Sequence, residues 1–272
     1  DYTAYLKRRN YSINTIGKCV KQLKTIMSLA EAEGYHNNAK YKDKRFKGTR
    51  VEVDSIYLTR EELEKIMAVP AELLSPGKQL ARDIFMIGVW TAQRVSDCNN
   101  IQPEDIHTTT KRWIEDIPDP EHPGQTTAVI RTKETTYIDI RQQKTGAKVS
   151  IPCSTELKAI LEKYEYKVPH LPDQDINRYI KEIGKLAGIT DEVEMESTKG
   201  GVSRLERIPK YQLIHSHTAR RTGATLMYLA GIDIYDIMKV TGHASPEILK
   251  KYIKADNLDV AEKLSDKYDY FD

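Results

Sequence analysis

The chain is short of cysteine and has no long apolar segment, and each shortage excludes a class of protein. Cys19, Cys98 and Cys153 are its only cysteines, and they are far apart and odd in number. They form neither a CxxC zinc pair nor a disulfide framework, so a reducing compartment is favoured. No run of about 18 apolar residues predicts a transmembrane helix. The polar opening DYTAYLKRRNYS lacks a signal-peptide pattern, and these absences together predict a cytoplasmic protein.

Charge is small overall but unevenly placed. The chain has 272 residues, enough for more than one domain, and a net charge of +2. Residues 1–50 contain twelve Lys and Arg against four Asp and Glu, a net charge of +8, which leaves −6 for the rest of the chain. A basic segment on a mildly acidic body is typical of a protein that grips nucleic-acid phosphates with one part of its chain.

The basic segment divides into helices and a linker. Apolar residues at helical spacing predict a short helix and then a longer one within residues 3–34, ended by Gly34. Residues 40–53 begin with a lysine-rich stretch without apolar period and predict a linker. We therefore expect a helical DNA-binding domain over residues 1–50. Its expected phosphate contacts are Lys18, Lys21, Lys24, Lys40, Lys42, Lys44, Arg45, Lys47 and Arg50.

Residues 54–272 predict a second, larger domain. Thr59 and Glu62 form a capping-box pattern before an apolar run. Further helical patterns cover residues 78–90 and 94–101 and return after residue 154, with a C-terminal tail at 256–272. The helical pattern is interrupted by a polar stretch at 190–213, which predicts a loop or a small hairpin.

A small sheet interrupts the helices in the middle of the chain. β-Branched residues favour strands at 127–132, 136–142 and 148–153, and Gly146 supplies a tight turn between the last two. The predicted fold class is therefore mainly α with a small antiparallel β-sheet.

Six side chains suited to phosphate chemistry follow one another along this second domain. Two guanidinium groups can hold a phosphodiester, imidazole and ammonium groups can move protons, and a phenol oxygen can attack the phosphorus. His217 and Arg220 are three residues apart and share a face of a predicted helix. Tyr252 is placed on a helix that begins at Ser245 and Pro246. The six are Arg94, Lys144, His217, Arg220, His243 and Tyr252.

With its local contexts, this ordered set resembles the active site of the tyrosine recombinases, the phage integrase family. TAQRVSD is similar to the family's first arginine box and QKTGAKVSIP to its β-hairpin lysine segment. HTARRTGAT and TGHASPEILKKY are similar to its second box. The resemblance covers residues 54 to 258 and is most like the integrases of mobile elements. It implies a helical core-binding domain followed by a tyrosine-recombinase catalytic domain.

The resemblance also implies a role for each group. Tyr252 attacks the scissile phosphate and forms a 3′-phosphotyrosyl bond, while Arg94 and Arg220 hold the phosphate oxygens. His243 donates a further hydrogen bond, and Lys144 protonates the leaving 5′ oxygen. His217 either accepts the tyrosine proton or orients the site. Lys148 could replace Lys144 as the acid, since both lie near the same turn.

Partners and cofactors follow from the same resemblance. The implied partner is double-stranded DNA in the bacterial cytoplasm. The protein is expected to be a monomer when free, and four copies are expected to assemble on DNA and exchange strands through a Holliday junction. Accessory DNA-bending or directionality proteins are expected, and the C-terminal tail is expected to dock on a neighbouring copy. No metal, ATP or other cofactor is expected.

The chain departs from the family pattern in three places. Ala92 stands where the family usually has glycine, and Cys98 where leucine is common. The segment before residue 54 is short for a core-binding domain, so we expect a chain truncated at its N-terminus. Two other functions remain open from the residues: a DNA-binding module that does not cleave, and a relaxing topoisomerase of the type IB kind.

Overall fold

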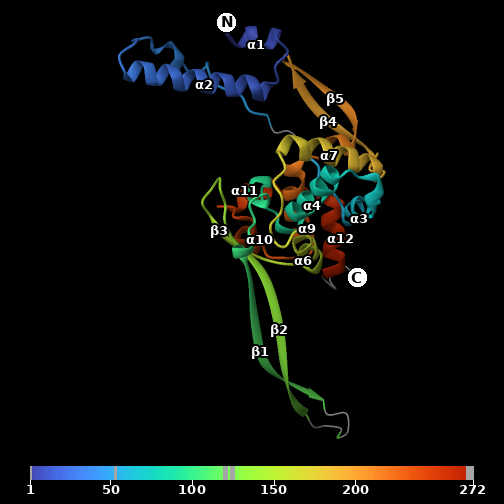
Figure 1. Ribbon diagram of the computed structural model, residues 1–272. Coiled ribbons are helices and arrows are strands. Elements are labelled where there is room, and N and C mark those ends of the chain that lie inside the picture. Colours follow the sequence, from blue (N-terminus) through green and yellow to red (C-terminus); the bar gives the residue numbers. More distant parts are fainter. Residues whose placement is uncertain (1, 52–53, 119–121, 123–125, 268–272) are drawn as a thin grey trace. The chain divides into compact units, whose positions relative to one another are not determined.

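The structure, a computed structural model, describes residues 2–51, 54–118, 122 and 126–267. Its contacts divide the chain into two compact units (Figure 1). Unit 1 combines Asp1–Ser55 with Asp191–Lys210, and unit 2 combines Ile56–Thr190 with Tyr211–Asp272. The domain division expected from the sequence assigns residues 191–210 to the larger domain, whereas their contacts group them with the N-terminal helices.

Unit 1 contains two consecutive helices and a two-stranded sheet. Helix α1 spans Tyr2–Arg8 and α2 spans Ile13–Ala32, and a 3-10 turn, η1, spans Ala39–Lys42. Ser12 caps α2 by accepting a hydrogen bond from the Thr15 backbone N–H. Strands β4 (Glu192–Lys199) and β5 (Val202–Pro209) form an antiparallel hairpin. The polar stretch at 190–213 therefore contains a hairpin, one of the two structures predicted there.

The hairpin is attached to the turn between α1 and α2. Gly200 has a φ of +60° at the tip, and its N–H donates to the Tyr11 carbonyl over 3.2 Å. Ser12 forms an isolated bridge with Lys199. The small apolar core of the unit lies between the two helices and consists of Leu6, Ile16 and Val20.

Unit 2 is built mainly from helices around one apolar core. Helix α4 is buried on most of its faces and contacts α7 and α9 more than any other helix. The capping box at Thr59 and Glu62 is confirmed. The helices are α3 (Arg60–Ala68), α4 (Pro76–Thr91), α5 (Val95–Cys98), α6 (Thr155–Lys163), α7 (Asp173–Leu186), α8 (Lys210–Leu213), α9 (Ser216–Leu229), α10 (Ile234–Thr241), α11 (Pro246–Lys250) and α12 (Asn257–Lys267), with 3-10 turns η2 (Ala71–Leu73) and η3 (Pro103–Asp105).

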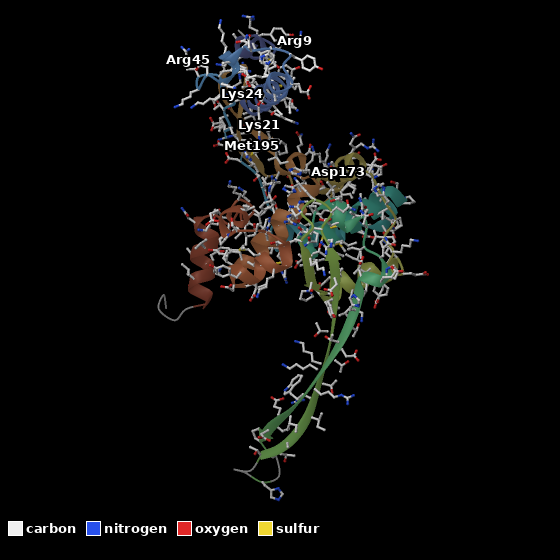
Figure 2. The ribbon with its side chains drawn as sticks, turned by 90° about the vertical axis from the view of Figure 1, so that its left-hand side faces the viewer. Arg9, Lys21, Lys24, Arg45, Asp173 and Met195 are labelled. Carbon is white, nitrogen blue, oxygen red and sulfur yellow. The ribbon has the colours of Figure 1, made fainter. Side chains whose placement is uncertain are left out.

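A three-stranded antiparallel sheet in the order β1-β2-β3 completes unit 2. Its strands are β1 (Ile106–Pro118), β2 (Thr126–Arg141) and β3 (Lys148–Pro152). The separate strands predicted at 127–132 and 136–142 are one continuous strand, and β1 was not predicted. Most β1 side chains are exposed on both faces (Figure 2), so the strand lacks the alternation that sequence patterns reveal.

Helix α12 lies in the tail predicted at 256–272 and packs on α9 of its own chain. The Tyr57 hydroxyl donates to the Asp259 carboxylate over 2.8 Å, and Lys263 Nζ lies 3.6 Å from the centre of the Tyr228 ring. Residues 268–272 lie outside the described part. The fold class, mainly α with small antiparallel sheets, is confirmed. Among the described residues, no helix is both long and apolar enough to cross a membrane.

Candidate active site and basic groove

Arg220 is the centre of the candidate active site and is completely buried. One terminal nitrogen of its guanidinium donates to the Ala92 carbonyl and the other to the Thr241 carbonyl, each over 2.8 Å. Its Nε has no hydrogen-bond partner among the described residues. Burial, and then the nearby charge of Arg94, lower the pKa of Arg220 to about 10, so the group stays charged at pH 7.

His243 is fixed in one tautomer by its neighbours. Its Nε2 lies 3.0 Å from a terminal nitrogen of Arg220, which has only protons to offer, so Nε2 accepts. Its Nδ1 lies 2.7 Å from the Thr241 hydroxyl, which itself donates to the Ile237 carbonyl. Nδ1 must therefore carry the proton. Burial, helped by the Arg220 charge, lowers the pKa of His243 to about 3 and keeps the ring neutral.

Tyr252 lies against both histidines and Arg220. Its ring centre is 4.5 Å from that of His243 and 5.2 Å from that of His217, and 5.3 Å from the Arg220 guanidinium carbon. Its carbonyl accepts from the Thr225 hydroxyl of α9 over 3.4 Å. The sequence placed Tyr252 on a helix, but α11 ends at Lys250 and Tyr252 stands in the turn that follows.

His217 stands at the start of α9, one turn before Arg220, so the predicted shared face is present. Burial and the neighbouring Arg221 and Arg220 charges lower the pKa of His217 to about 4. Its ring stacks at 6.4 Å on that of His215, whose pKa burial likewise lowers to about 4. The histidines beside Tyr252 are thus neutral at pH 7.

The two remaining predicted groups are placed differently. Arg94 caps the N-terminus of α5 and donates to the Gln142 side-chain oxygen over 3.2 Å. Its charge lowers the pKa of Arg220 and of His243, which brings it electrostatically into the same cluster. Lys144 is exposed in the turn between β2 and β3 and has no hydrogen bond or ion pair among the described residues. Five of the six groups therefore share one cluster. The sixth, Lys144, is exposed to solvent two residues after Gln142.

Two polar residues of this cluster were missed in the sequence. Gln142 is 1% exposed and makes four side-chain hydrogen bonds. Asp97 is 4% exposed, and its Oδ1 accepts from the Gln143 N–H over 2.9 Å. Asp97 follows Arg94 by one helical turn, a spacing that offered a signal; Gln142 carried none, because an amide has no characteristic motif.

The departures from the family pattern have structural accounts. Ala92 ends α4 with a φ of +51°, a left-handed conformation that glycine adopts without strain. Its buried carbonyl still accepts from Arg220, so the side chain adds strain without removing the contact. Cys98 is fully buried in the main core, where it behaves as a small apolar residue.

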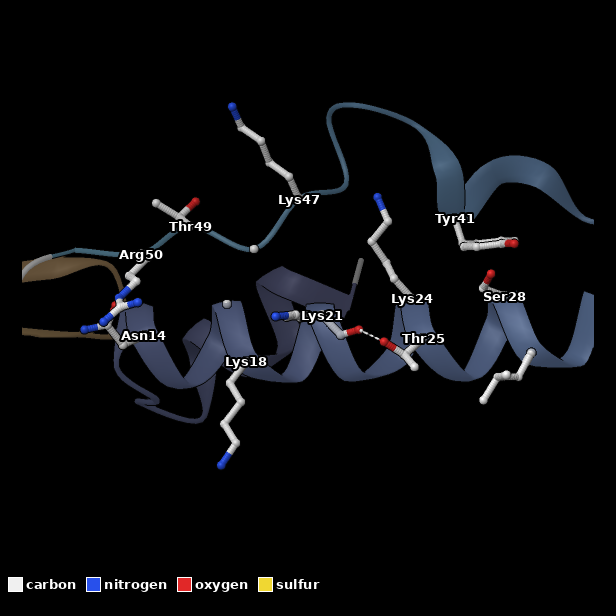
Figure 3. A pocket seen from close by; sticks show the side chains of 13 residues that line it. Asn14, Lys18, Lys21, Lys24, Thr25, Ser28, Tyr41, Lys47, Thr49 and Arg50 are labelled. Atoms are coloured by element: carbon white, nitrogen blue, oxygen red, sulfur yellow. Dashed lines mark hydrogen bonds between the residues drawn. The ribbon is translucent and has the colours of Figure 1, made fainter. Parts of the chain in front are cut away.

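A basic groove, lined chiefly by α2 and residues 47–50, lies in unit 1 (Figure 3). Its volume is about 800 Å³. Two glycines allow the linker backbone to approach α2 closely. A Cβ on Gly17 would lie 2.2 Å from the Thr49 carbonyl oxygen, and one on Gly48 would lie 2.4 Å from the Gly17 oxygen. The Asn14 side chain also exchanges two 2.9 Å hydrogen bonds with the Val51 backbone. The linker is thereby fixed along the helix.

The predicted phosphate contacts divide by how their charges are used. The groove is lined by Lys18, Lys21, Lys24, Lys47 and Arg50. Lys24 and Lys47 extend to the same side of α2 and Lys18 to the opposite side (Figure 3). Lys18 and Lys24 are six residues apart on α2, so their directions differ by about 120° around the helix.

Some of these charges already have partners within unit 1, where Lys21, Lys24 and Arg45 are marked in Figure 2. Lys24 donates to the Phe46 carbonyl, Lys42 pairs with Glu31 at 2.6 Å and Arg45 with Asp43 at 2.7 Å. Among the described residues, the others have neither an ion pair nor a side-chain hydrogen bond: Lys18, Lys21, Lys40, Lys44, Lys47 and Arg50.

No group of three or more His, Cys, Asp or Glu side chains in the described ranges is arranged to hold a metal ion.

Comparison with known proteins identifies a family and a shared fold. The model of the phage integrase family matches residues 57–258. No curated protein sequence matches the chain. A lambda integrase dimer bound to a COC′ core site is 20% identical, with a TM-score of 0.57 over 88% of this chain and 59% of that one. A lambda integrase tetramer bound to a Holliday junction is 21% identical, with a TM-score of 0.58 over the same shares.

The Tn1549 transposon integrase in complex with circular-intermediate DNA is 13% identical. Its TM-score is 0.59, with 98% of this chain and 83% of that one covered. These identities show a shared fold. The chain spans about 59% of the length of the lambda integrase chains that it matches.

Proposed function

Because the chain belongs to the phage integrase family, we propose that it is a site-specific DNA recombinase that cuts and rejoins strands through a covalent 3′-phosphotyrosyl intermediate. The observation that carries the proposal is the place of Tyr252, whose ring contacts a buried, charged Arg220 and two neutral histidines. A phenol has a pKa of about 10, so attack at pH 7 needs a base and nearby positive charge.

In the proposed reaction, the Tyr252 oxygen attacks the phosphorus and the bond from phosphorus to the 5′ oxygen breaks. His217, whose ring lies against that of Tyr252, accepts the phenolic proton. Arg94 and Arg220 bind the non-bridging oxygens, and the unpartnered Nε of Arg220 is a donor available for this. Lys144, exposed on its turn, gives a proton to the departing 5′ oxygen.

His243 requires a change of state to serve the same phosphate. In the free chain its Nε2 accepts from Arg220 and so has no proton to donate. An incoming phosphate adds negative charge, which raises the pKa of the imidazole and favours protonation at Nε2. We therefore expect His243 to donate only once DNA is bound.

Unit 1 would supply affinity for the DNA backbone. The exposed cations of the basic groove can replace counterions along a duplex without reading its sequence. We further propose that the partner is double-stranded DNA in the bacterial cytoplasm, with four copies assembled on two sites and a Holliday junction as intermediate. Accessory DNA-bending or directionality proteins belong to the same proposal. The phosphotyrosyl bond conserves the energy of the phosphodiester, so the proposed reaction requires no ATP. We also expect it to need no metal or other cofactor.

The experiment uses a nicked duplex carrying the joined-end sequence of the element that encodes the chain. The nick lets the short cleaved fragment diffuse away, so the covalent intermediate accumulates. We expect wild type, in EDTA, to form a protein–DNA adduct on a denaturing gel, and Tyr252→Phe to form none while binding the duplex equally well. Tyr235→Phe, which changes an exposed tyrosine of α10, is the matched control and should react like wild type. Binding by wild type without an adduct would favour a DNA-binding module instead.

A further inference from the structure

Gln142 is buried at the centre of the candidate active site although no role is assigned to it. It directly follows β2, stands two residues before Lys144 and is 1% exposed. Its backbone N–H donates to the Ala147 carbonyl, and its carbonyl accepts from the Gly146 N–H, each over 2.8 Å. The residue thus closes the base of the turn on which Lys144 stands.

The side-chain amide uses its full hydrogen-bonding capacity. Its oxygen accepts from an Arg94 guanidinium nitrogen at 3.2 Å and from the Thr145 hydroxyl at 2.6 Å. Its nitrogen donates to the Gln93 side-chain oxygen at 2.6 Å and to the Thr241 carbonyl at 2.8 Å. A flipped amide would point its own protons at the Arg94 donor, so only one orientation satisfies all four partners.

The same side chain packs against the segment that carries His243. Gly242 has a φ of +69°, and a Cβ there would lie 2.6 Å from the Gln142 amide. The Thr241 carbonyl accepts from both Gln142 and Arg220, and the Thr241 hydroxyl holds His243. One amide therefore touches the segments that carry Arg94, Lys144 and His243, and shares an acceptor with Arg220.

We propose that Gln142 is a positioning residue for strand cleavage, which couples the orientation of Arg94 to that of the turn bearing Lys144. The inference rests on the proposed function. Loss of the amide leaves the Arg94 guanidinium without a side-chain acceptor and the turn without its Thr145 anchor. Both the binding of the phosphate oxygens and the delivery of the leaving-group proton are then impaired together.

The test compares Gln142→Ala with Asn99→Ala. Asn99 is a buried amide of the same unit. Its side chain is hydrogen-bonded to the Leu171 backbone and, among the described residues, to no member of the cluster, so it controls for loss of a buried amide as such. Adduct formation is measured at saturating protein on the nicked duplex, once with the normal phosphodiester and once with sulfur in place of the 5′ bridging oxygen. A thiolate leaves without being protonated, so the sulfur substrate bypasses Lys144.

We expect Gln142→Ala to slow adduct formation on the normal substrate about 10- to 100-fold, and Asn99→Ala less than about 3-fold. On the sulfur substrate the defect of Gln142→Ala should shrink but persist, because Arg94 remains misplaced. Lys144→Ala, by contrast, should be restored almost fully. A Gln142→Ala defect of equal size on both substrates, or none on either, would overturn the coupling.

A second measurement does not depend on cleavage. Arginine-selective NMR of the free protein reports the Arg94 side chain, which Arg94→Lys identifies. We expect its terminal Nη–H signals, which report the hydrogen bond to Gln142, to move toward the position of exposed arginines in Gln142→Ala and to stay unchanged in Asn99→Ala. An unchanged Arg94 signal in Gln142→Ala contradicts the proposal. Failure of wild type to form any adduct, with the NMR shift present, would count against the proposed function and leave the positioning role standing.

Discussion

The candidate active site and the basic groove both present positive charge, but they hold it in opposite ways. At the active site the charge is buried and directed: Arg220 is fully enclosed and has two backbone acceptors. In the groove, Lys18, Lys21, Lys47 and Arg50 are exposed, and in the described part of the chain they have no ion pair. The first arrangement fixes a few atoms in position, whereas the second only concentrates charge along a surface.

This difference determines how each region should respond to change. A buried, hydrogen-bonded charge is weakly screened by salt, and its removal leaves partners unsatisfied. An exposed lysine is flexible and well screened, and each one contributes little. Mutations at the active site should therefore act on the rate of cleavage and on stability. Mutations in the groove should act on affinity and on its salt dependence.

The largest effect is expected from Arg220→Ala. It removes the proposed phosphate donor, a loss that typically costs about 10²–10³ in rate. It also leaves the Ala92 carbonyl without its partner and the Thr241 carbonyl with one donor fewer. Adduct formation and the melting temperature should both fall, with DNA affinity nearly unchanged. Arg178→Ala, at an exposed arginine paired with Asp175 in the same unit, is the control and should alter neither. A large loss of DNA affinity in Arg220→Ala would mean that Arg220 contributes to DNA binding in the way expected of the groove cations.

The same contrast explains what the sequence could predict. Arg220, His243 and Tyr252 carry distinctive chemistry within a short, ordered segment, so a pattern of residue types was enough to select them. Gln142 could not be selected, because its importance arises only when Gln93, Thr241 and Arg94 meet around it in the folded chain. Assigning positive charge to residues 1–50 required only a count of residues.

Local structure was predictable where an element buries one face, and the prediction failed where an element buries none. The helices around α4 have an apolar stripe, and the capping box at Thr59 marks where one of them begins. Strand β1 has almost no buried side chain, and it is defined by its pairing with β2, which appears only in the folded chain. The close approach of Gly17 and Gly48 was equally invisible, since nothing in a sequence says which glycine faces another backbone.

A second, smaller effect is expected from Gly17→Ala. Helix propensity alone favours alanine by about 1 kcal/mol, but here the new Cβ would lie 2.2 Å from the Thr49 carbonyl oxygen. We expect the linker to separate from α2 and DNA affinity to fall about tenfold, with the rate of adduct formation at saturating protein unchanged. Gln22→Ala, at an exposed site of α2, is the control. A rise in melting temperature without loss of affinity would mean that the groove does not depend on this contact.

Acid should destabilise the protein through the buried histidines of the candidate active site. The pKa of His217 falls to about 4 and that of His243 to about 3 on folding, from an ordinary value near 6.5. The unfolded chain therefore binds more protons, so stability is complete above pH 6.5 and is lost as the pH falls toward 4. The melting temperature of wild type should drop over this range. His217→Asn should reduce the slope, since it removes one buried imidazole, and an unchanged slope would exclude His217 as a contributor.

The smallest effect separates two lysines of unit 1. Lys47 lines the groove and has no ion pair with any residue that the structure describes, whereas Lys42 lies 2.6 Å from Glu31. Lys47→Ala should weaken binding to a non-specific duplex a few-fold and reduce the slope of log affinity against log salt by about 1, the share of one phosphate contact. Lys42→Ala should change the slope less, because its ammonium already has a carboxylate partner that DNA must displace. Equal changes for the two lysines would mean that DNA meets both charges alike, and that the groove is only part of a wider basic surface.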